Sequence, residues 1–245
     1  MLTISYTIYM AEPLIPSILV VDDDKDIVTA ICKLLEMEGF NLIKAYNGFE
    51  ALDCILNNSV HLILIDVMMP KLDGLSAMIQ IRQTQNIPII VLSAKSQESD
   101  KILGLSMGAD DYITKPYNPN ELIARVRSNL RRYLHLGDVS GISRGNTITI
   151  GALTLDTTSR QLYVDNDPVK LTATELKIVE LLMCNAGRIF SADEIYNKVW
   201  NEEAYAVENT VMVHIRRIRE KIEIIPKEPR YLKVVWGIGY KIEKA

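Results

Sequence analysis

The most informative segment of the chain is His61-Leu62-Ile63-Leu64-Ile65-Asp66-Val67-Met68-Met69-Pro70. A short apolar run that leads into one carboxylate is typical of a strand buried on both faces of a parallel sheet, with Asp66 at its carboxyl end. Ligands of open α/β sheets bind at that edge. The sequence therefore predicts that Asp66 lies in a ligand site.

Three other apolar runs also end in polar side chains. Residues 18–21 lead into three consecutive aspartates, residues 89–92 lead into Ser93, and residues 112–114 lead into Lys115. The carboxyl ends of parallel strands meet at one edge of the sheet. We therefore expect several carboxylates, a hydroxyl and an ammonium group to share one pocket.

The chemistry of this pocket points to a divalent cation and a phosphoryl group. Neighbouring carboxylates stay ionised together only when a cation joins them, and Mg²⁺ prefers oxygen ligands. Lys115 offers a compact positive charge to phosphate oxygens, and Ser93 offers a hydroxyl donor. With Mg²⁺ bound, Asp66 could act as a nucleophile toward phosphorus and form an acyl phosphate. Any single aspartate could merely cap a helix, but the joint pattern favours the functional interpretation.

These motifs, in this order, resemble the receiver domain of bacterial two-component response regulators. The segments that carry the resemblance are residues 20–23, 64–74, 92–94 and 110–116. The resemblance implies Asp66 as phosphoacceptor and a metal site, for Mg²⁺, made of Asp22, Asp23, Asp66 and the backbone carbonyl of Met68. It further implies that Lys115 binds the phosphoryl group and that Ser93 and Tyr112 form a switch pair.

Length and charge favour two modest domains. The chain has 245 residues and is 48% hydrophobic, so each of two domains can bury a core. Residues 1–144 carry 13 Lys and Arg against 17 Asp and Glu, and residues 145–245 carry 14 of each kind. Since neither half is basic overall, a DNA-binding site has to rest on local placement. No segment is long and apolar enough to span a membrane, so we expect a soluble, cytoplasmic protein without a membrane partner.

The cysteines and the N-terminus carry little functional signal. Cys32, Cys54 and Cys184 lie in apolar helical patterns without metal-ligand spacing, so we expect reduced core residues. Residues 1–9 are apolar but too short, and without the basic flank, for a signal peptide. We interpret residues 1–17 as an N-terminal extension.

Residues 18–133 alternate apolar strands with amphipathic helices, which is typical of a doubly wound, flavodoxin-like parallel sheet. The five expected strands are residues 18–21, 42–45, 62–65, 89–92 and 111–114. The last helix has Asn118 as N-cap, Pro119 at its first position and Glu121 where a capping box places its acid. This helix should end near Arg132. Residues 134–146 bring three glycines and no helical period, and are predicted to be a linker.

Residues 147–245 have a different pattern. Short strands are expected at 147–150 and 161–164, with turn-forming residues at 165–168. Capping boxes then mark the starts of two helices, and a third helix over about residues 207–224 precedes a terminal hairpin. The capping boxes are Thr172 with Glu175 and Ser191 with Glu194, and the hairpin contains Trp236-Gly237-Ile238-Gly239-Tyr240. This order of strands, three helices and a terminal hairpin predicts a winged helix-turn-helix (α+β) domain.

Two segments of this domain, residues 171–175 and 211–219, resemble the effector domain of the OmpR/PhoB class. The pattern is most similar to the VanR-like branch, and resemblance covers nearly everything after Pro16. Family members often carry an arginine just before the Gly-x-Gly of the wing, whereas this chain has Trp236. This departure argues against an electrostatic contact of the wing, although the wing itself remains.

The third helix has one apolar stripe, formed by Val211, Ile215, Ile218 and Ile222, which must pack on the domain core. The side chains expected to point away from it are Asn209, Val213, Arg216, Arg217 and Glu220. A solvated cationic face is the simple explanation, but two capped helices before it and a hairpin after it favour a recognition helix in the major groove.

In that placement Val213 and Arg217 would face base edges, and His214 and Arg219 would reach phosphates. Neither arginine belongs to the apolar stripe, so we expect both to be replaceable without loss of the fold. The full set of expected DNA contacts is Asn209, Thr210, Val213, His214, Arg216, Arg217, Arg219, Trp236 and Tyr240.

Together the resemblances imply a phosphorylation-controlled transcription factor, not an enzyme, with at most slow self-dephosphorylation. A sensor histidine kinase would donate the phosphoryl group to Asp66, and receivers would then pair through the fourth helix, fifth strand and fifth helix. The paired effector domains would bind direct repeats in double-stranded promoter DNA, with RNA polymerase as a further partner. The cross-subunit pairs that the family interface implies are Lys101 with Glu121, Asp111 with Arg125, and Asp110 with Arg127.

Two other classes compete with this interpretation. A haloacid-dehalogenase-like phosphohydrolase also has an aspartate nucleophile after a hydrophobic strand and a second aspartate two positions on, and Asp22 and Asp24 satisfy that spacing. The remaining motifs fit receiver order, however, and a winged helix leaves little chain for a cap domain. The second alternative is a winged helix that binds protein and never contacts DNA.

Overall fold

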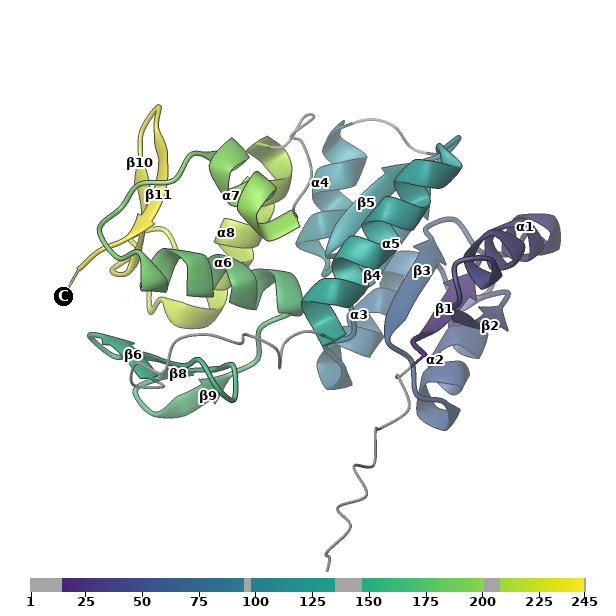
Figure 1. The fold of residues 1–245 in the computed structure, drawn as a ribbon, viewed down its shortest axis with the longest axis horizontal. Coiled ribbons are helices and arrows are strands. Elements are labelled where there is room, and N and C mark those ends of the chain that lie inside the picture. The colour runs from purple at the N-terminus through teal and green to yellow at the C-terminus, as the bar shows by residue number, and fades with distance from the viewer. Residues whose placement is uncertain (1–14, 95–97, 135–146, 201–207, 245) are drawn as a thin grey trace, which may run out of the picture.

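The computed structural model of the protein describes residues 15–94, 98–134, 147–200 and 208–244. These residues form an α/β domain and a smaller α+β domain that lie side by side (Figure 1). Most of the expected extension and nearly all of the expected linker lie outside the described residues.

The first domain has the expected flavodoxin-like architecture. Its elements are β1 (Ser17–Val21), α1 (Lys25–Glu36), β2 (Asn41–Ala45), α2 (Gly48–Asn57), β3 (Leu62–Asp66), α3 (Gly74–Thr84), β4 (Ile89–Ser93), α4 (Glu98–Ser106), β5 (Asp111–Thr114) and α5 (Pro119–Leu134). All five strands are parallel, in the order β2-β1-β3-β4-β5. Each strand lies within one residue of its predicted bounds, and β3 and β4 are buried throughout because helices cover both faces.

The start of α5 follows its predicted signal only in part. The side chain of Asn118 accepts a hydrogen bond of 2.8 Å from the backbone N–H of Asn120, as an N-cap does. Glu121 pairs with Arg125 one turn later instead of returning to the cap. The helix continues to Leu134, two residues past Arg132.

The second domain contains a four-stranded antiparallel sheet, three helices and a hairpin. Its elements are β6 (Thr147–Ile150), β7 (Leu153–Asp156), β8 (Gln161–Val164), β9 (Asp167–Val169), α6 (Ala173–Cys184), α7 (Ala192–Trp200), α8 (Glu208–Ile222), β10 (Leu232–Val235) and β11 (Gly239–Ile242). Strand β7 was not predicted, and residues 165–168, all expected in a turn, lie partly in a strand. Only Asp165 and Asn166 have positive φ, 51° and 71°, and form the two-residue hairpin turn. Pro168 lies in β9, which is an edge strand and tolerates it.

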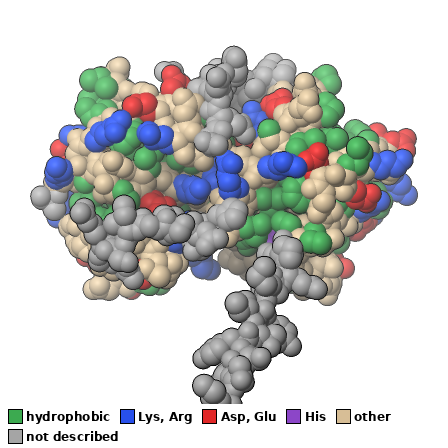
Figure 2. Space-filling view, in the orientation of Figure 1, with side chains coloured by type: hydrophobic (Ala, Val, Ile, Leu, Met, Phe, Trp, Pro, Cys, Tyr) green, Lys and Arg blue, Asp and Glu red, His purple; other side chains and the backbone are tan. Residues whose placement is uncertain are grey.

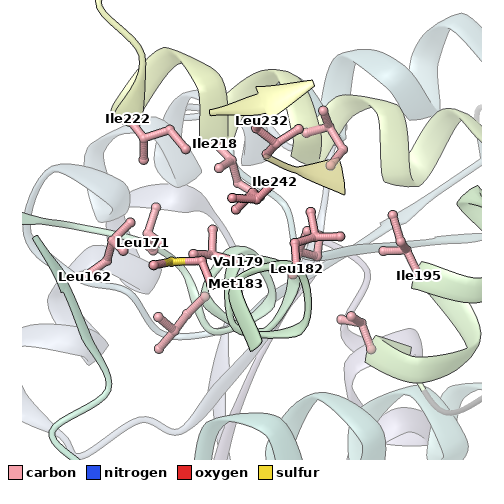
Figure 3. Close-up of a cluster of buried hydrophobic side chains, with 14 of the residues drawn as sticks. Leu162, Leu171, Val179, Leu182, Met183, Ile195, Ile218, Ile222, Leu232 and Ile242 are labelled. Atoms are coloured by element: carbon pink, nitrogen blue, oxygen red, sulfur yellow. The ribbon is translucent and has the colours of Figure 1, made fainter. Parts of the chain in front are cut away.

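The apolar stripe of α8 packs into the core of this domain, as predicted. Figure 3 shows Ile218 and Ile222 facing Val179 and Met183 of α6 and Leu232 and Ile242 of the hairpin. Both capping boxes are present: Thr172 and Glu175 exchange two hydrogen bonds, and so do Ser191 and Glu194. Helices α6 and α7 therefore start where the sequence places them.

The cysteine prediction is only partly correct. Cys32 is buried and Cys54 half-buried, but Cys184 is exposed because it is the last residue of α6. All three are free thiols. Within the described ranges, no helix combines the length and the apolar character that crossing a membrane requires.

Candidate functional site

Asp66 is the last residue of β3 and is 5% exposed. The first turn of α3 comes close to it, because a Cβ built on Gly74 would lie 1.9 Å from the backbone oxygen of Asp66. Only glycine fits there. Asp73 caps this helix by accepting a hydrogen bond of 2.9 Å from the backbone N–H of Ser76. The segment after β3 thus fixes the loop that surrounds the carboxylate of Asp66.

The structure gathers the predicted strand ends into one pocket. The Nζ atom of Lys115 lies 2.6 Å from Oδ2 of Asp22 and 2.6 Å from Oδ1 of Asp66. The second oxygen of Asp66 accepts a hydrogen bond of 2.6 Å from the backbone N–H of Met68. Two carboxylates from β1 and β3 therefore converge on one ammonium group from the end of β5.

Burial and charge act against each other in this pocket. Burial raises the pKa of Asp66, and the hydrogen bond and charge of Lys115 only partly offset this rise. Burial alone would lower the pKa of Lys115, but its hydrogen bonds to Asp22 and Asp66 raise it. The ammonium group therefore stays charged and holds the two carboxylates together.

The oxygens of the pocket fit a hard divalent cation. The carboxylates of Asp22 and Asp66 already share one cation, the ammonium group of Lys115, and Asp23 is exposed at the rim. Nowhere in the described part of the chain do three His, Cys, Asp or Glu side chains gather as metal ligands. Mg²⁺ needs few protein ligands because it retains several waters. Two convergent carboxylates, the rim carboxylate and a backbone carbonyl suit it.

Asp24 does not take part in this pocket. Its side chain caps α1 by accepting hydrogen bonds of 2.9 Å and 3.3 Å from the backbone N–H groups of Asp26 and Ile27. This capping role accounts for the third aspartate of the run. It leaves the phosphohydrolase alternative without the second catalytic aspartate that its spacing suggested.

The two residues of the expected switch pair lie on neighbouring strands. Ser93 ends β4 and is 1% exposed, and Tyr112 lies on β5 and is 8% exposed. The ring of Tyr112 lies against α4, because a Cβ built on Gly104 would lie 3.2 Å from it. The ring of Tyr112 thus connects β5 with α4.

The predicted recognition face of α8 is solvated only in part: Arg216 and Glu220 are exposed, whereas the side chains expected at base edges are buried, contrary to the prediction. Val213, His214 and Arg217 are 3%, 0% and 8% exposed because α8 packs against α4 of the first domain (Figure 1). Val213 belongs to the same buried cluster as Leu105 and Tyr112. The side chains expected to read DNA therefore form part of the interface between the two domains.

In this interface the guanidinium group of Arg217 has several polar partners, whereas the ring of His214 has an aromatic neighbour. Nη2 of Arg217 lies 2.8 Å from Oε1 of Glu175, and Nη1 donates to the backbone oxygens of Leu105 at 3.3 Å and Ala109 at 3.0 Å. His214 lies beside the ring of Trp200, with 5.4 Å between ring centroids. Across the described residues, neither ring nitrogen of His214 has a hydrogen-bond partner.

Helix α5 supplies a second set of contacts that the sequence reading missed. Nη1 of Arg125 donates to Oη of Tyr196 at 3.3 Å. Oγ of Ser128 donates to the backbone oxygen of Trp200 at 2.5 Å, and Nη1 of Arg132 donates to that of Val199 at 3.2 Å. The only sequence signal was a polar face on α5, which is equally typical of a solvated helix.

Most of the groups expected in a dimer interface have partners within this single chain. Asp110 pairs with Arg82 at 2.6 Å, and Asp111 pairs with Arg125 at 2.9 Å. Arg127 pairs with Glu38. The side chain of Lys101 lies outside the described residues. The cross-subunit pairs remain a prediction, because they require a second chain.

The remaining expected DNA contacts are accessible to different degrees. Arg216 is exposed and pairs with Glu220, whereas Nε of Arg219 donates to the backbone oxygen of Leu232 at 2.9 Å. Trp236, at the tip of the hairpin, is 88% exposed. Asn209, Thr210 and Tyr240 are half-buried.

A groove of about 820 Å³ runs between α8 and the hairpin, lined by Met212, Arg216, Arg219, Trp236 and Tyr240 among others. The face of the molecule in Figure 2 has Lys and Arg side chains spread over both domains, without one dominant basic patch.

Two family models match the chain. The model described as response regulator receiver domain matches residues 18–127, and the model described as transcriptional regulatory protein, C terminal, matches residues 166–242. Regulatory protein VanR of Enterococcus faecium is 40% identical over 228 residues, which cover 93% of this chain and 98% of VanR. Transcriptional regulatory protein YvrH of Bacillus subtilis is 41% identical over 226 residues, which cover 92% of this chain and 94% of YvrH.

A solved structure shares the arrangement of both domains. The RitR C128S mutant covers 94% of this chain and 100% of its own, with a TM-score of 0.74 and 21% sequence identity. At this identity the likeness concerns the fold alone.

Proposed function

Because this chain belongs to the OmpR/PhoB-type response regulators, we propose that phosphorylation of Asp66 by a sensor histidine kinase controls its binding to promoter DNA. The observation that carries the proposal is the convergence of Asp22, Asp66 and Lys115 at one sheet edge. The names of VanR and YvrH, a regulatory protein and a transcriptional regulatory protein, support a role in transcription.

The residues of the pocket take distinct roles in this proposal. Mg²⁺, when held by Asp22, Asp23, Asp66 and the carbonyl of Met68, would neutralise negative charge on the phosphoryl oxygens. Lys115 would exchange one of its carboxylate partners for a phosphoryl oxygen, since its charge is already directed at Asp66. Ser93 would donate its hydroxyl to the same group. Tyr112 would follow and alter the packing of α4 at Gly104.

Paired receivers would then present two effector domains to DNA. Pairing would use α4, β5 and α5, with the cross-subunit pairs Lys101 with Glu121, Asp111 with Arg125, and Asp110 with Arg127. Exposed ion pairs contribute roughly 0.2–1 kcal/mol each, so apolar contacts have to supply part of the stability. Two linked domains bind direct repeats more tightly through their effective concentration. RNA polymerase, in the cytoplasm, would be the final partner.

Binding of DNA requires that α8 first leaves the receiver. A recognition helix presents its side chains to base edges in the major groove, and Val213 and Arg217 are buried in the interface with α4. The closed arrangement in this structure is therefore the form that does not bind DNA through this face.

The test is incubation of the full chain with Mg²⁺ and acetyl phosphate, followed by intact mass measurement. A single stoichiometric phosphorylation that Asp66→Asn abolishes supports a receiver, whereas continuous turnover with Asp22 as nucleophile supports a hydrolase. Selection of genomic fragments by the phosphorylated protein at physiological salt then tests DNA binding. Failure to retain any fragment supports a protein-binding winged helix instead.

A further inference from the structure

Arg217 is the one side chain of α8 for which the described contacts show an ion pair within its own domain and charge-assisted hydrogen bonds to the other domain. Within its own domain it pairs with Glu175, whose carboxylate is fully buried and also lies 2.6 Å from Nζ of Lys221. Across the interface it donates to the backbone oxygens of Leu105 and Ala109. Charge-assisted hydrogen bonds of this kind are stronger than neutral ones.

The carbonyls that Arg217 reaches lie at the C-terminal end of α4. Leu105 is the penultimate residue of this helix, and Ala109 follows just after its end. The last carbonyls of a helix lack partners within the helix and carry partial negative charge, so a cation is favourable there. Arg82, from α3, donates to the oxygen of Gly108 at 2.9 Å in the same region. The end of α4 is thus capped by one arginine from each domain.

We propose that Arg217 is an autoinhibitory latch, which caps the C-terminal end of α4 in the closed chain and has to release it before α8 can bind DNA. The inference rests on the proposed function, since it gives the regulation of the same helix. The guanidinium cannot cap α4 and face a base edge at once, so the two states compete for one side chain.

Closure also covers the surface through which receivers would pair. Helix α8 lies on α4, while α5 contacts Tyr196, Val199 and Trp200 at the end of α7. Arg125 pairs with Asp111 and also bonds Tyr196, so it cannot keep this geometry with a partner receiver on the same face. The closed monomer and the α4-β5-α5 dimer are therefore mutually exclusive. Phosphorylation that favours the dimer would therefore separate Arg217 from the backbone oxygens at the end of α4, without any direct contact between the phosphoryl group and Arg217.

The latch can be tested from the receiver side, without changing any residue expected to contact DNA. Ser106 is the exposed last residue of α4 and lines a cleft of about 280 Å³ together with Lys170, Arg217 and Lys221. Glu220 also lines the cleft, so the effector side carries these three cations against one carboxylate. That net positive charge repels a lysine at position 106 and attracts a glutamate. Asn57, the exposed last residue of α2, is the matched control site.

Opening is measured on the full, unphosphorylated chain in two ways. The first is the radius of gyration from small-angle X-ray scattering. The second is the fraction of tryptophan fluorescence that acrylamide quenches, because Trp200 is fully buried under α5 whereas Trp236 is already exposed. We expect Ser106→Lys to shift the equilibrium toward the open form by about twofold to fivefold and Ser106→Glu to shift it by a similar factor toward the closed form. Asn57→Lys and Asn57→Glu should change neither readout.

The outcomes separate the latch from the proposed function. If Ser106→Lys and Ser106→Glu leave both readouts unchanged, or move them in the same direction, the latch is overturned. If they move them in opposite directions while the phosphorylated chain retains no DNA, the latch stands and the proposed function fails. If the variants also shift the DNA affinity of the unphosphorylated chain in opposite directions, both are supported.

Discussion

The ammonium nitrogen of Lys115 lies 2.6 Å from Oδ1 of Asp66, although 49 residues separate them in the chain. The pair joins the ends of β3 and β5, and Asp22 from β1 completes it at 2.6 Å. Removing one partner of a buried ion pair is costly when the other charge is left unpaired, but Lys115 keeps Asp22 as a partner when Asp66 becomes neutral. Variants at Asp66 therefore separate chemistry from folding.

Asp66→Asn should remove phosphorylation and leave the fold intact. The amide keeps the size of the side chain and carries no charge, so it avoids the cost of burying a carboxylate, the same burial that raises the pKa of Asp66. We therefore expect a change in unfolding free energy of less than about 1 kcal/mol. Dimerisation that depends on acetyl phosphate should disappear in sedimentation experiments. Asp73→Asn, which keeps a capping side chain on α3, is the control and should still be phosphorylated. A variant at Asp66 that still dimerises with the phosphodonor would show that another residue accepts the phosphoryl group.

Acid should open the closed form through His214. Burial, and after it the charge of Arg217, lowers the pKa of His214 from 6.5 to about 4, while Asp110 and Glu175 act in the opposite direction. The charge of Asp110 is balanced by Arg82, whose Nη2 lies 2.6 Å from Oδ2 of Asp110. In the open form the ring meets water and regains its ordinary pKa. Above about pH 6.5 the ring is neutral in both forms, and closure has its full stability. As the pH falls from 6.5 toward 4, only the open form takes up the proton, so closure weakens.

The expected size of this effect is about tenfold in the opening equilibrium between about pH 7.5 and about pH 5.5. Acrylamide quenching of Trp200 measures it on the unphosphorylated chain. His214→Gln, which cannot take up a proton in this range, is the matched control and should show a flat profile. An equal pH dependence in wild type and variant would assign the effect to other groups.

The receiver pocket could be predicted from sequence because its signal is local. Each strand end carries its own polar residue, and a parallel sheet necessarily brings those ends together, as Asp22, Asp66 and Lys115 show. The α8 stripe was predictable for the same reason, since a period of 3.6 residues fixes one face. Strand β7 was missed because its four residues offer only two apolar positions, Leu153 and Leu155, which is the shortest alternation that indicates a strand.

The interface between the domains could not be predicted in this way. Arg217 is 112 residues from Leu105, and no local pattern encodes that distance. Because Arg217 is charged and the ring of His214 is polar, helical periodicity predicts that both side chains lie on the solvent face of α8. They are buried because Glu175 and two backbone oxygens satisfy the arginine, and because Trp200 covers the histidine. Packing partners decide the burial of such side chains, and the two backbone oxygens that Arg217 reaches lie in the other domain.

The hairpin tip should contact DNA through apolar surface. Trp236 is 88% exposed, so Trp236→Ala should change the unfolding free energy by no more than about 0.5 kcal/mol. If the tip enters the minor groove, this variant should weaken DNA binding without changing the salt slope, whereas Trp236→Arg should steepen the slope by about one unit. Lys233→Ala, an exposed residue at the base of the hairpin, serves as a reference for loss of a simple charge. Wild-type affinity and slope in both tryptophan variants would place the tip away from DNA.

The two arginines at the C-terminal half of α8 should differ in DNA binding and in stability. Arg217→Ala leaves the buried carboxylate of Glu175 with Lys221 as its remaining cationic partner, so we expect the variant to fold with a loss of about 1–3 kcal/mol of stability. In the phosphorylated, open chain the same variant should cost about 1–3 kcal/mol of binding and relax preference at one base pair.

Arg219 differs because it is anchored on the hairpin through the backbone oxygen of Leu232, beside the groove next to α8. Arg219→Ala should weaken specific and non-specific DNA alike and reduce the salt slope by about one unit. Arg216→Ala, which removes an exposed arginine paired with Glu220, is the matched control for stability. The measurement is a salt titration with a selected operator and its point variants, on phosphorylated protein. A uniform loss of affinity in Arg217→Ala together with altered base preference in Arg219→Ala would mean that α8 enters the groove with Arg219, and not Arg217, facing the base edges.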